Sequence, residues 1–125
     1  MNIVDSSGWL EYFADGPNAD SFAEPLSDRE KLLVPAIIIY EAFKVVLRER
    51  GENSALQAAA LLRQGTVVPL TEDLALSAAR LSMAHRIPMA DSIILATARA
   101  NDATIWTQDD DFKGLYGVRY FAKTT

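Results

Sequence analysis

The sequence predicts an α/β fold in which a parallel sheet of five strands is flanked by helices. Short apolar runs of strand length alternate along the chain with longer stretches of helical periodicity, which is typical of parallel strands joined by crossover helices. Half of the 125 residues are hydrophobic, so the chain can bury a substantial core. No repeat, low-complexity tract or linker divides it, and we therefore expect one domain over residues 1–125.

Five apolar segments are the expected strands, and turn or helix signals follow each of the first four. They cover residues 1–4, 32–34, 66–70, 103–107 and 118–121.

Helices are expected between these strands, where apolar residues recur three or four positions apart. They cover residues 9–13, 20–28, 35–50, 56–61, 74–81 and 89–100. The last of these is apolar nearly all round over residues 93–98, which indicates a buried helix.

Several residues mark where these helices begin and end. Pro35 suits the first position of a helix because its missing N–H costs nothing there. Gly51 is placed to cap the end of the same helix, and Asn53 or Ser54 can cap the start of the next. Thr71 can cap the helix that carries residues 74–81.

The composition excludes several classes of site. The chain has no cysteine and one histidine, so disulfides, cysteine nucleophiles, zinc ribbons, iron–sulfur clusters and histidine-rich metal sites are excluded. No stretch approaches the roughly 20 apolar residues that cross a bilayer, and Asp5 interrupts the N-terminus before a signal-peptide core can form. We therefore expect no membrane partner and a cytoplasmic location. The net charge of −5 argues at first sight against nucleic acid, because phosphates are bound mainly by Lys and Arg.

Five acids stand where they contribute little to a purely structural role. Asp5 follows the first strand directly, and Asp109 and Asp111 follow the fourth. Glu41 lies about two turns into the helix after the second strand, and Asp91 stands in the first turn of the buried helix. In open parallel sheets ligands bind beyond the carboxyl ends of the strands where the strand order reverses, so these carboxylates can converge at one edge.

Carboxylates brought that close raise one another's pKa unless cations join them. Hard oxygen ligands without histidine or cysteine select Mg²⁺ or Mn²⁺ rather than zinc. A pair of such ions about 4 Å apart activates water and stabilises the leaving oxygen in phosphodiester hydrolysis. The sequence therefore predicts a Mg²⁺ or Mn²⁺ site.

Four sequence motifs resemble those of the PIN-domain ribonucleases, and their order and length are most similar to the VapC toxins of VapBC toxin–antitoxin systems. The motifs are Asp5-Ser6-Ser7, Glu41 within a helix, Asp91-Ser92 before the apolar run 93–98, and residues 107–112. Position 92 is Ser where that family commonly has Ala. The resemblance covers essentially the whole chain.

The resemblance implies a PIN-like three-layer sandwich with strand order 3-2-1-4-5, and a metal-dependent endoribonuclease acting on single-stranded or loop RNA. It implies catalytic and metal-binding roles for the acids, with Asp111 peripheral and with support from two hydroxyl groups. The residues are Asp5, Glu41, Asp91, Asp109, Asp111, Thr107 and Ser6. It also implies a homodimer inhibited by a VapB-type antitoxin whose C-terminal segment lies over the active-site groove.

Simpler interpretations stay open beside these roles. Asp5 can cap the first helix, and residues 109–111 can form a solvated turn, to which we assign Asp110. Glu41 can lie on a solvent-facing stripe. Lys44 and Arg48 follow Glu41 at a spacing that places all three on one helix face, so they can contact an RNA backbone or be solvated.

Two alternative functions follow from the same residues. The first is a catalytically idle PIN-like module that acts by binding protein or RNA. The second is a haloacid-dehalogenase-like phosphatase, which is disfavoured because that class needs a second Asp two residues after the first and position 7 is Ser. The charge does not exclude RNA, because without the five site acids the remaining acids equal the 12 bases. Two divalent ions would reduce the net charge to about −1.

Overall fold

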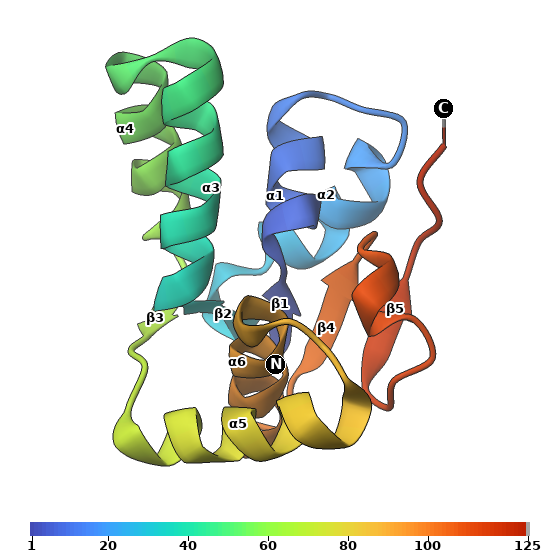
Figure 1. The fold of residues 1–125 in the computed structure, drawn as a ribbon. Coiled ribbons are helices and arrows are strands. Elements are labelled where there is room, and N and C mark those ends of the chain that lie inside the picture. The colour runs from blue at the N-terminus through green and yellow to red at the C-terminus, as the bar shows by residue number, and fades with distance from the viewer. Residues whose placement is uncertain (125) are drawn as a thin grey trace.

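A computed structural model describes residues 1–124 and confirms the predicted fold class (Figure 1). The sheet has strand order β3-β2-β1-β4-β5, and every neighbouring pair is parallel. The described strands are β1 (Asn2–Val4), β2 (Leu32–Pro35), β3 (Thr66–Val68), β4 (Thr104–Thr107) and β5 (Val118–Tyr120).

The sheet is flanked by helices that pack in three pairs, α1 with α2, α3 with α4, and α5 with α6 (Figure 1). The α-helices of residues 1–124 are α1 (Ser6–Phe13), α2 (Ala19–Ser27), α3 (Ala36–Arg50), α4 (Glu52–Leu62), α5 (Glu72–His85) and α6 (Met89–Ala100). Two short 3-10 helices, η1 (Arg29–Lys31) and η2 (Asp110–Phe112), lie before β2 and after β4. No helix in this part of the chain has the length and apolar character needed to span a bilayer.

The central strand β1 anchors the core. Ile3 and Val4 are fully buried and stand opposite Ile105 and Trp106 of β4. A fully buried side chain of this size stabilises the fold by about 1.5–3 kcal/mol relative to an exposed one. Gly8 lets α1 approach β1 closely, because a Cβ there would lie 2.6 Å from a methyl carbon of Val4. The start of α1 is therefore fixed against the sheet.

The buried helix α6 has the predicted bounds, residues 89–100, and its residues from Asp91 to Ala98 are all buried. The predicted caps Gly51 and Thr71 are also confirmed. Gly51 ends α3 with a φ of 88°, and the Thr71 hydroxyl accepts a hydrogen bond from the Leu74 N–H at 3.2 Å.

Three local predictions are wrong. Pro35 is the last residue of β2 and precedes the helix, because its ψ of 137° is extended. Neither Asn53 nor Ser54 caps α4, because Gly51 is both the C-cap of α3 and the N-cap of α4. β3 ends at Val68, before Pro69, which has no N–H to continue a ladder.

Candidate metal centre

The predicted site lies at the carboxyl ends of β1 and β4, the two strands between which the chain order of the sheet reverses. Asp5 directly follows β1, and Asp109 is the second residue after β4. The Asp5 N–H donates to the Trp106 carbonyl at 3.2 Å, so the two chain segments remain paired beyond the strands. This is the edge at which open α/β sheets bind ligands.

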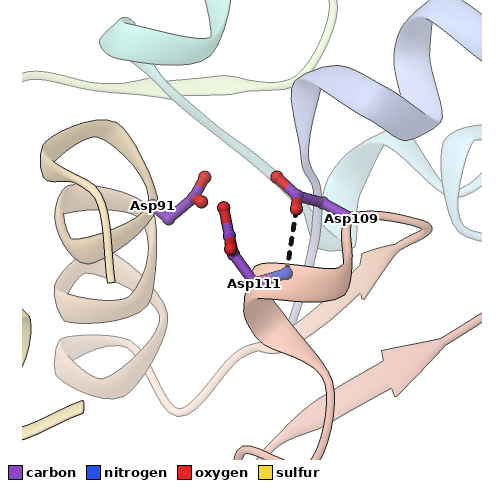
Figure 2. Close-up of side chains that lie close together, drawn as sticks. All are labelled: Asp91, Asp109 and Asp111. Atoms are coloured by element: carbon purple, nitrogen blue, oxygen red, sulfur yellow. Dashed lines mark hydrogen bonds between the residues drawn. The ribbon is translucent and has the colours of Figure 1, made fainter. Parts of the chain in front are cut away.

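Three carboxylates meet in front of this edge. One carboxylate oxygen from each of Asp91, Asp109 and Asp111 lies within 4.8 Å of the other two. Figure 2 shows Asp91 reaching from α6 toward the two aspartates of the β4–η2 segment. Asp109 Oδ1 accepts a hydrogen bond from the Asp111 N–H at 2.9 Å, which fixes the turn that brings Asp111 back. Asp111, expected as a peripheral ligand, is the exposed member of this group.

Asp5 is held behind the group by hydrogen bonds to both of its oxygens. Oδ1 accepts from the Ser7 hydroxyl at 2.7 Å and from the Gly8 N–H at 3.1 Å, so Asp5 also caps α1. Oδ2 accepts from the Thr107 hydroxyl at 2.8 Å. The Thr107 oxygen in turn accepts from the Asp109 N–H at 2.9 Å, so one buried hydroxyl connects two of the predicted site acids.

Glu41 faces the same region from α3. Its Oε1 is buried and has no hydrogen-bond partner among the described residues. Burial raises the pKa of Glu41, the Ser6 hydroxyl lowers it, and the Asp109 carboxylate raises it. The side chain is therefore only partly exposed, and it has an unsatisfied acceptor beside the group.

The electrostatics reflect this crowding. Burial, followed by the charges of Asp109 and Asp111, raises the pKa of Asp91 to about 8. Burial raises the pKa of Asp5 to about 6, against the hydrogen bonds from Ser7 and Thr107. Burial also raises the pKa of Glu41. In Asp5, Glu41 and Asp91 the surroundings thus disfavour the ionised form, which is the condition that a bound cation relieves.

The residues present fit a divalent cation. The group offers only carboxylate oxygens, the hard ligands that Mg²⁺ and Mn²⁺ prefer. The orphaned Oε1 of Glu41 is a further acceptor, and a buried acceptor without a partner is costly. Asp91, Asp109 and Asp111 can therefore hold an ion, with Glu41 next to them.

Lys44 and Arg48, the two residues predicted to contact an RNA backbone, form no hydrogen bond or ion pair with the site acids. Lys44 is exposed and donates to the Tyr40 hydroxyl at 3.5 Å, whereas Arg48 lies 3.6 Å from Glu49. Asp110 is exposed, as expected for a turn residue, and accepts a hydrogen bond from the Tyr120 hydroxyl.

Sequence reasoning missed the role of Ser7. Its hydroxyl donates to Asp5 and accepts from the Gln108 N–H at 3.2 Å, so it links α1 to the end of β4. The only signal was its place in the Asp5-Ser6-Ser7 motif.

Comparisons with known proteins identify the family and the fold. A family model described as PIN domain matches residues 3–118. The chain belongs to the PIN domain family. A search of curated protein sequences found no match.

Solved structures share the fold at low sequence identity. A toxin–antitoxin complex from Klebsiella pneumoniae matches with a TM-score of 0.82 and 20% identity, covering 98% of this chain and 100% of that one. VapC20 of Mycobacterium tuberculosis, a toxin that cleaves the sarcin–ricin loop, matches with a TM-score of 0.77 and 20% identity over 95% and 99% of the two chains. VapBC2 from Rickettsia felis, bound to a DNA fragment from its promoter, matches with a TM-score of 0.73 and 13% identity over 97% of each chain.

Proposed function

We propose that this chain is the ribonuclease toxin of a toxin–antitoxin system and hydrolyses RNA phosphodiester bonds in the presence of Mg²⁺ or Mn²⁺. The observation that carries the proposal is the convergence of the Asp91, Asp109 and Asp111 carboxylates at the carboxyl edge of a PIN-type sheet. The shared fold with VapC20, which cleaves RNA of the sarcin–ricin loop, supports the choice of substrate class.

The side chains divide into ligands and residues that orient them. Asp91, Asp109 and Asp111 would hold the cation, with Glu41 and Asp5 completing the acidic set. When bound, a divalent ion supplies electrostatic stabilisation for the charge that develops on the phosphate oxygens during hydrolysis. Thr107 orients Asp5, and the Asp111 N–H orients Asp109. Without a cation these acids repel an RNA phosphate, so we expect substrate binding itself to depend on the metal.

Cleavage of RNA by the purified protein tests this function. We expect hydrolysis with Mg²⁺ or Mn²⁺, loss of hydrolysis with EDTA, and at least a hundredfold lower rate in the Asp91→Asn variant, since removing a metal ligand costs several kcal/mol of transition-state stabilisation. Asp102→Asn is the matched control, because Asp102 is exposed in the turn before β4, away from the acids. Full activity of Asp91→Asn, or RNA binding without any cleavage in the wild type, would contradict the proposal. The second result would favour an idle PIN-like binding module.

We further propose that the inhibitory partner is a VapB-type antitoxin, as in the toxin–antitoxin complexes that share the fold. A cavity of about 520 Å³ lies between α1 and the α3–α4 pair, and its lining combines apolar side chains such as Leu10 and Phe13 with charged ones such as Glu49 and Arg50. Ser7 and Gln108 also line it, so the cavity extends to the neighbours of Asp5 and Asp109. A helical antitoxin segment in this groove would bring a basic side chain toward the acids, where opposite charge attracts it.

The proposal includes a homodimer. Leu76 and Met83 are 51% and 84% exposed on α5, at a spacing that places them on one face of the helix. A second copy of the chain that packs on this face of α5 would cover both side chains. Sedimentation velocity tests it, with a dimer expected for the wild type and a monomer for Met83→Glu; a monomeric wild type would contradict it.

A further inference from the structure

Two tyrosine–lysine pairs lie near the acidic group, and the ribonuclease chemistry uses neither. The first is Tyr40 with Lys44 on α3, and the second is Tyr120 of β5 with Lys113, which directly follows η2. In both pairs the lysine Nζ is 5.6 Å from the centre of the tyrosine ring. The pairs come from elements on opposite sides of β1 and β4, because α3 follows β2 and β5 is the edge strand beyond β4 (Figure 1).

The first pair adjoins the Glu41 side of the group. Lys44 lies three residues after Glu41 on α3, a spacing that makes the two side chains neighbours on the helix, and Tyr40 is 59% exposed. The Lys44 Nζ lies 3.5 Å from the Tyr40 hydroxyl, closer to that end of the ring than to its centre. A face of the ring is thus left available beside an exposed ammonium group.

The second pair adjoins the Asp109 side. Tyr120 stands opposite Thr107 at the carboxyl end of the sheet. Its hydroxyl donates to Asp110, which fixes the ring, and Lys113 lies beside that ring. The Asp109 carboxylate is near enough to influence the Tyr120 hydroxyl, so this pair also stands beside the acidic group.

The two lysines are available to an anion. Neither Lys44 nor Lys113 forms an ion pair with a carboxylate within the described residues, and both are exposed. A group of acids repels an RNA backbone on its own, so binding requires cations placed around it. An aromatic face next to a cation is the combination that holds an unpaired nucleotide, since the ring stacks on the base and the cation contacts the phosphate.

We propose that the Tyr40–Lys44 and Tyr120–Lys113 pairs bind two nucleotides of a single-stranded RNA, one on either side of the phosphate at the acidic group. This inference rests on the proposed function, because it takes the acids as the place of cleavage. Bases within a duplex are stacked on one another and cannot stack on a protein ring. The two pairs therefore select RNA whose bases are unpaired.

Steady-state cleavage and fluorescence anisotropy with a labelled single-stranded oligoribonucleotide test the inference in the full chain with Mn²⁺. We expect Tyr40→Leu and Tyr120→Leu each to raise KM and the anisotropy Kd about tenfold, with kcat changed less than about threefold. Tyr40→Phe retains the ring and should bind as the wild type does. Tyr116→Leu is the matched control, because Tyr116 is 89% exposed and precedes the amino end of β5.

The lysines have a separate signature. Lys44→Gln and Lys113→Gln should each reduce the slope of log Kd against log salt concentration by about 1, as expected for the loss of one phosphate contact. Lys31→Gln, in η1 on the amino side of β2, should leave that slope unchanged.

The outcomes separate this inference from the proposed function. If the wild type cleaves RNA and both leucine variants keep its KM and Kd, the two-site binding is wrong and the ribonuclease function stands. If the wild type does not cleave RNA, the proposed ribonuclease function is wrong. The anisotropy measurement still tests the inference, because weaker RNA binding by the leucine variants would support it and unchanged binding would contradict it. Equal affinity for the duplex of the same sequence would also overturn it.

Discussion

At the scale of single residues, Thr107 connects the acids to one another. Its hydroxyl donates to Asp5 and accepts from the Asp109 N–H, and its side chain is fully buried. The carboxylates differ in pKa because their surroundings differ. Asp5 has three hydrogen-bond donors that favour its ionised form, whereas Asp91 is buried beside the carboxylates of Asp109 and Asp111.

The Thr107→Val substitution tests this connection. It keeps the shape of the side chain but leaves an Asp5 oxygen and the Asp109 N–H without their partner, which costs about 1–3 kcal/mol in the free energy of unfolding. It also removes a donor that lowers the Asp5 pKa, so the acidic limb of the pH–activity profile should move to higher pH. Urea unfolding and the pH profile of RNA cleavage measure the two effects.

Thr97→Val is the matched control. Thr97 is equally buried, but its hydroxyl donates only to the Ile93 carbonyl of its own helix, at 2.8 Å. Its pH profile should be that of the wild type. If Thr107→Val left the profile unchanged as well, Thr107 would not orient Asp5.

The sequence indicated the candidate residues better than their arrangement. Asp5, Glu41 and Asp91 were identifiable because each stands directly after a strand or within an apolar helical run, although Asp5 also serves as the N-cap of α1. The close approach of Asp111 was not, because it depends on η2, a single turn closed by the Asp109 side chain. The hydrogen bond from the Gln108 N–H to the Ser7 hydroxyl joins residues 101 positions apart, which local patterns do not report.

At the scale of elements, the strand order explains where the candidate site lies. The reversal between β1 and β4 places the ends of two strands next to each other, and α3, α6 and η2 all begin at the same edge. Element boundaries were less predictable where one residue serves two elements. Gly51 is both the C-cap of α3 and the N-cap of α4, and Pro35 is both the last residue of β2 and the N-cap of α3.

The groove between α1 and the α3–α4 pair carries a prediction about inhibition. Leu61 lines this groove and is 41% exposed, so its substitution leaves the core intact. We expect Leu61→Asp to cleave RNA as the wild type does but to require at least tenfold more antitoxin for half-inhibition, because it places a charge in an apolar contact. Titration of RNA cleavage with purified antitoxin measures this. Unchanged inhibition would place the antitoxin elsewhere.

At the scale of the whole molecule, the net charge of −5 has a local origin. The five site acids account for the excess, since the other acids equal the 12 bases in number. The charge therefore predicts weak RNA binding without metal and does not exclude RNA as a substrate.

The raised pKa values predict how stability changes with pH. The folded chain holds protons on Asp5 up to about pH 6 and on Asp91 up to about pH 8, whereas the unfolded chain releases them near 3.8. The folded state therefore binds more protons in this range, and the contribution of these groups to the free energy of unfolding falls as pH rises through these folded-state values. Divalent cations bind the ionised carboxylates and should reverse the loss.

Thermal melting with and without Mn²⁺ measures this linkage. The increase in Tm on adding Mn²⁺ should be larger at about pH 8 than at about pH 6, the two folded-state pKa values. The Asp91→Asn variant should lose most of the increase. An increase independent of pH, or equal in the variant, would mean that Mn²⁺ binds elsewhere.

The most direct test of the central claim is the dependence of RNA cleavage on Mn²⁺ concentration in the wild type and in Asp109→Asn. Asp109 influences the pKa of Asp5, Glu41 and Asp91, so it stands at the centre of the acidic group. We predict that wild-type cleavage rises from zero in EDTA to saturation with Mn²⁺, and that Asp109→Asn requires at least tenfold more Mn²⁺ or does not cleave. Wild-type cleavage and Mn²⁺ dependence in Asp109→Asn would contradict the account.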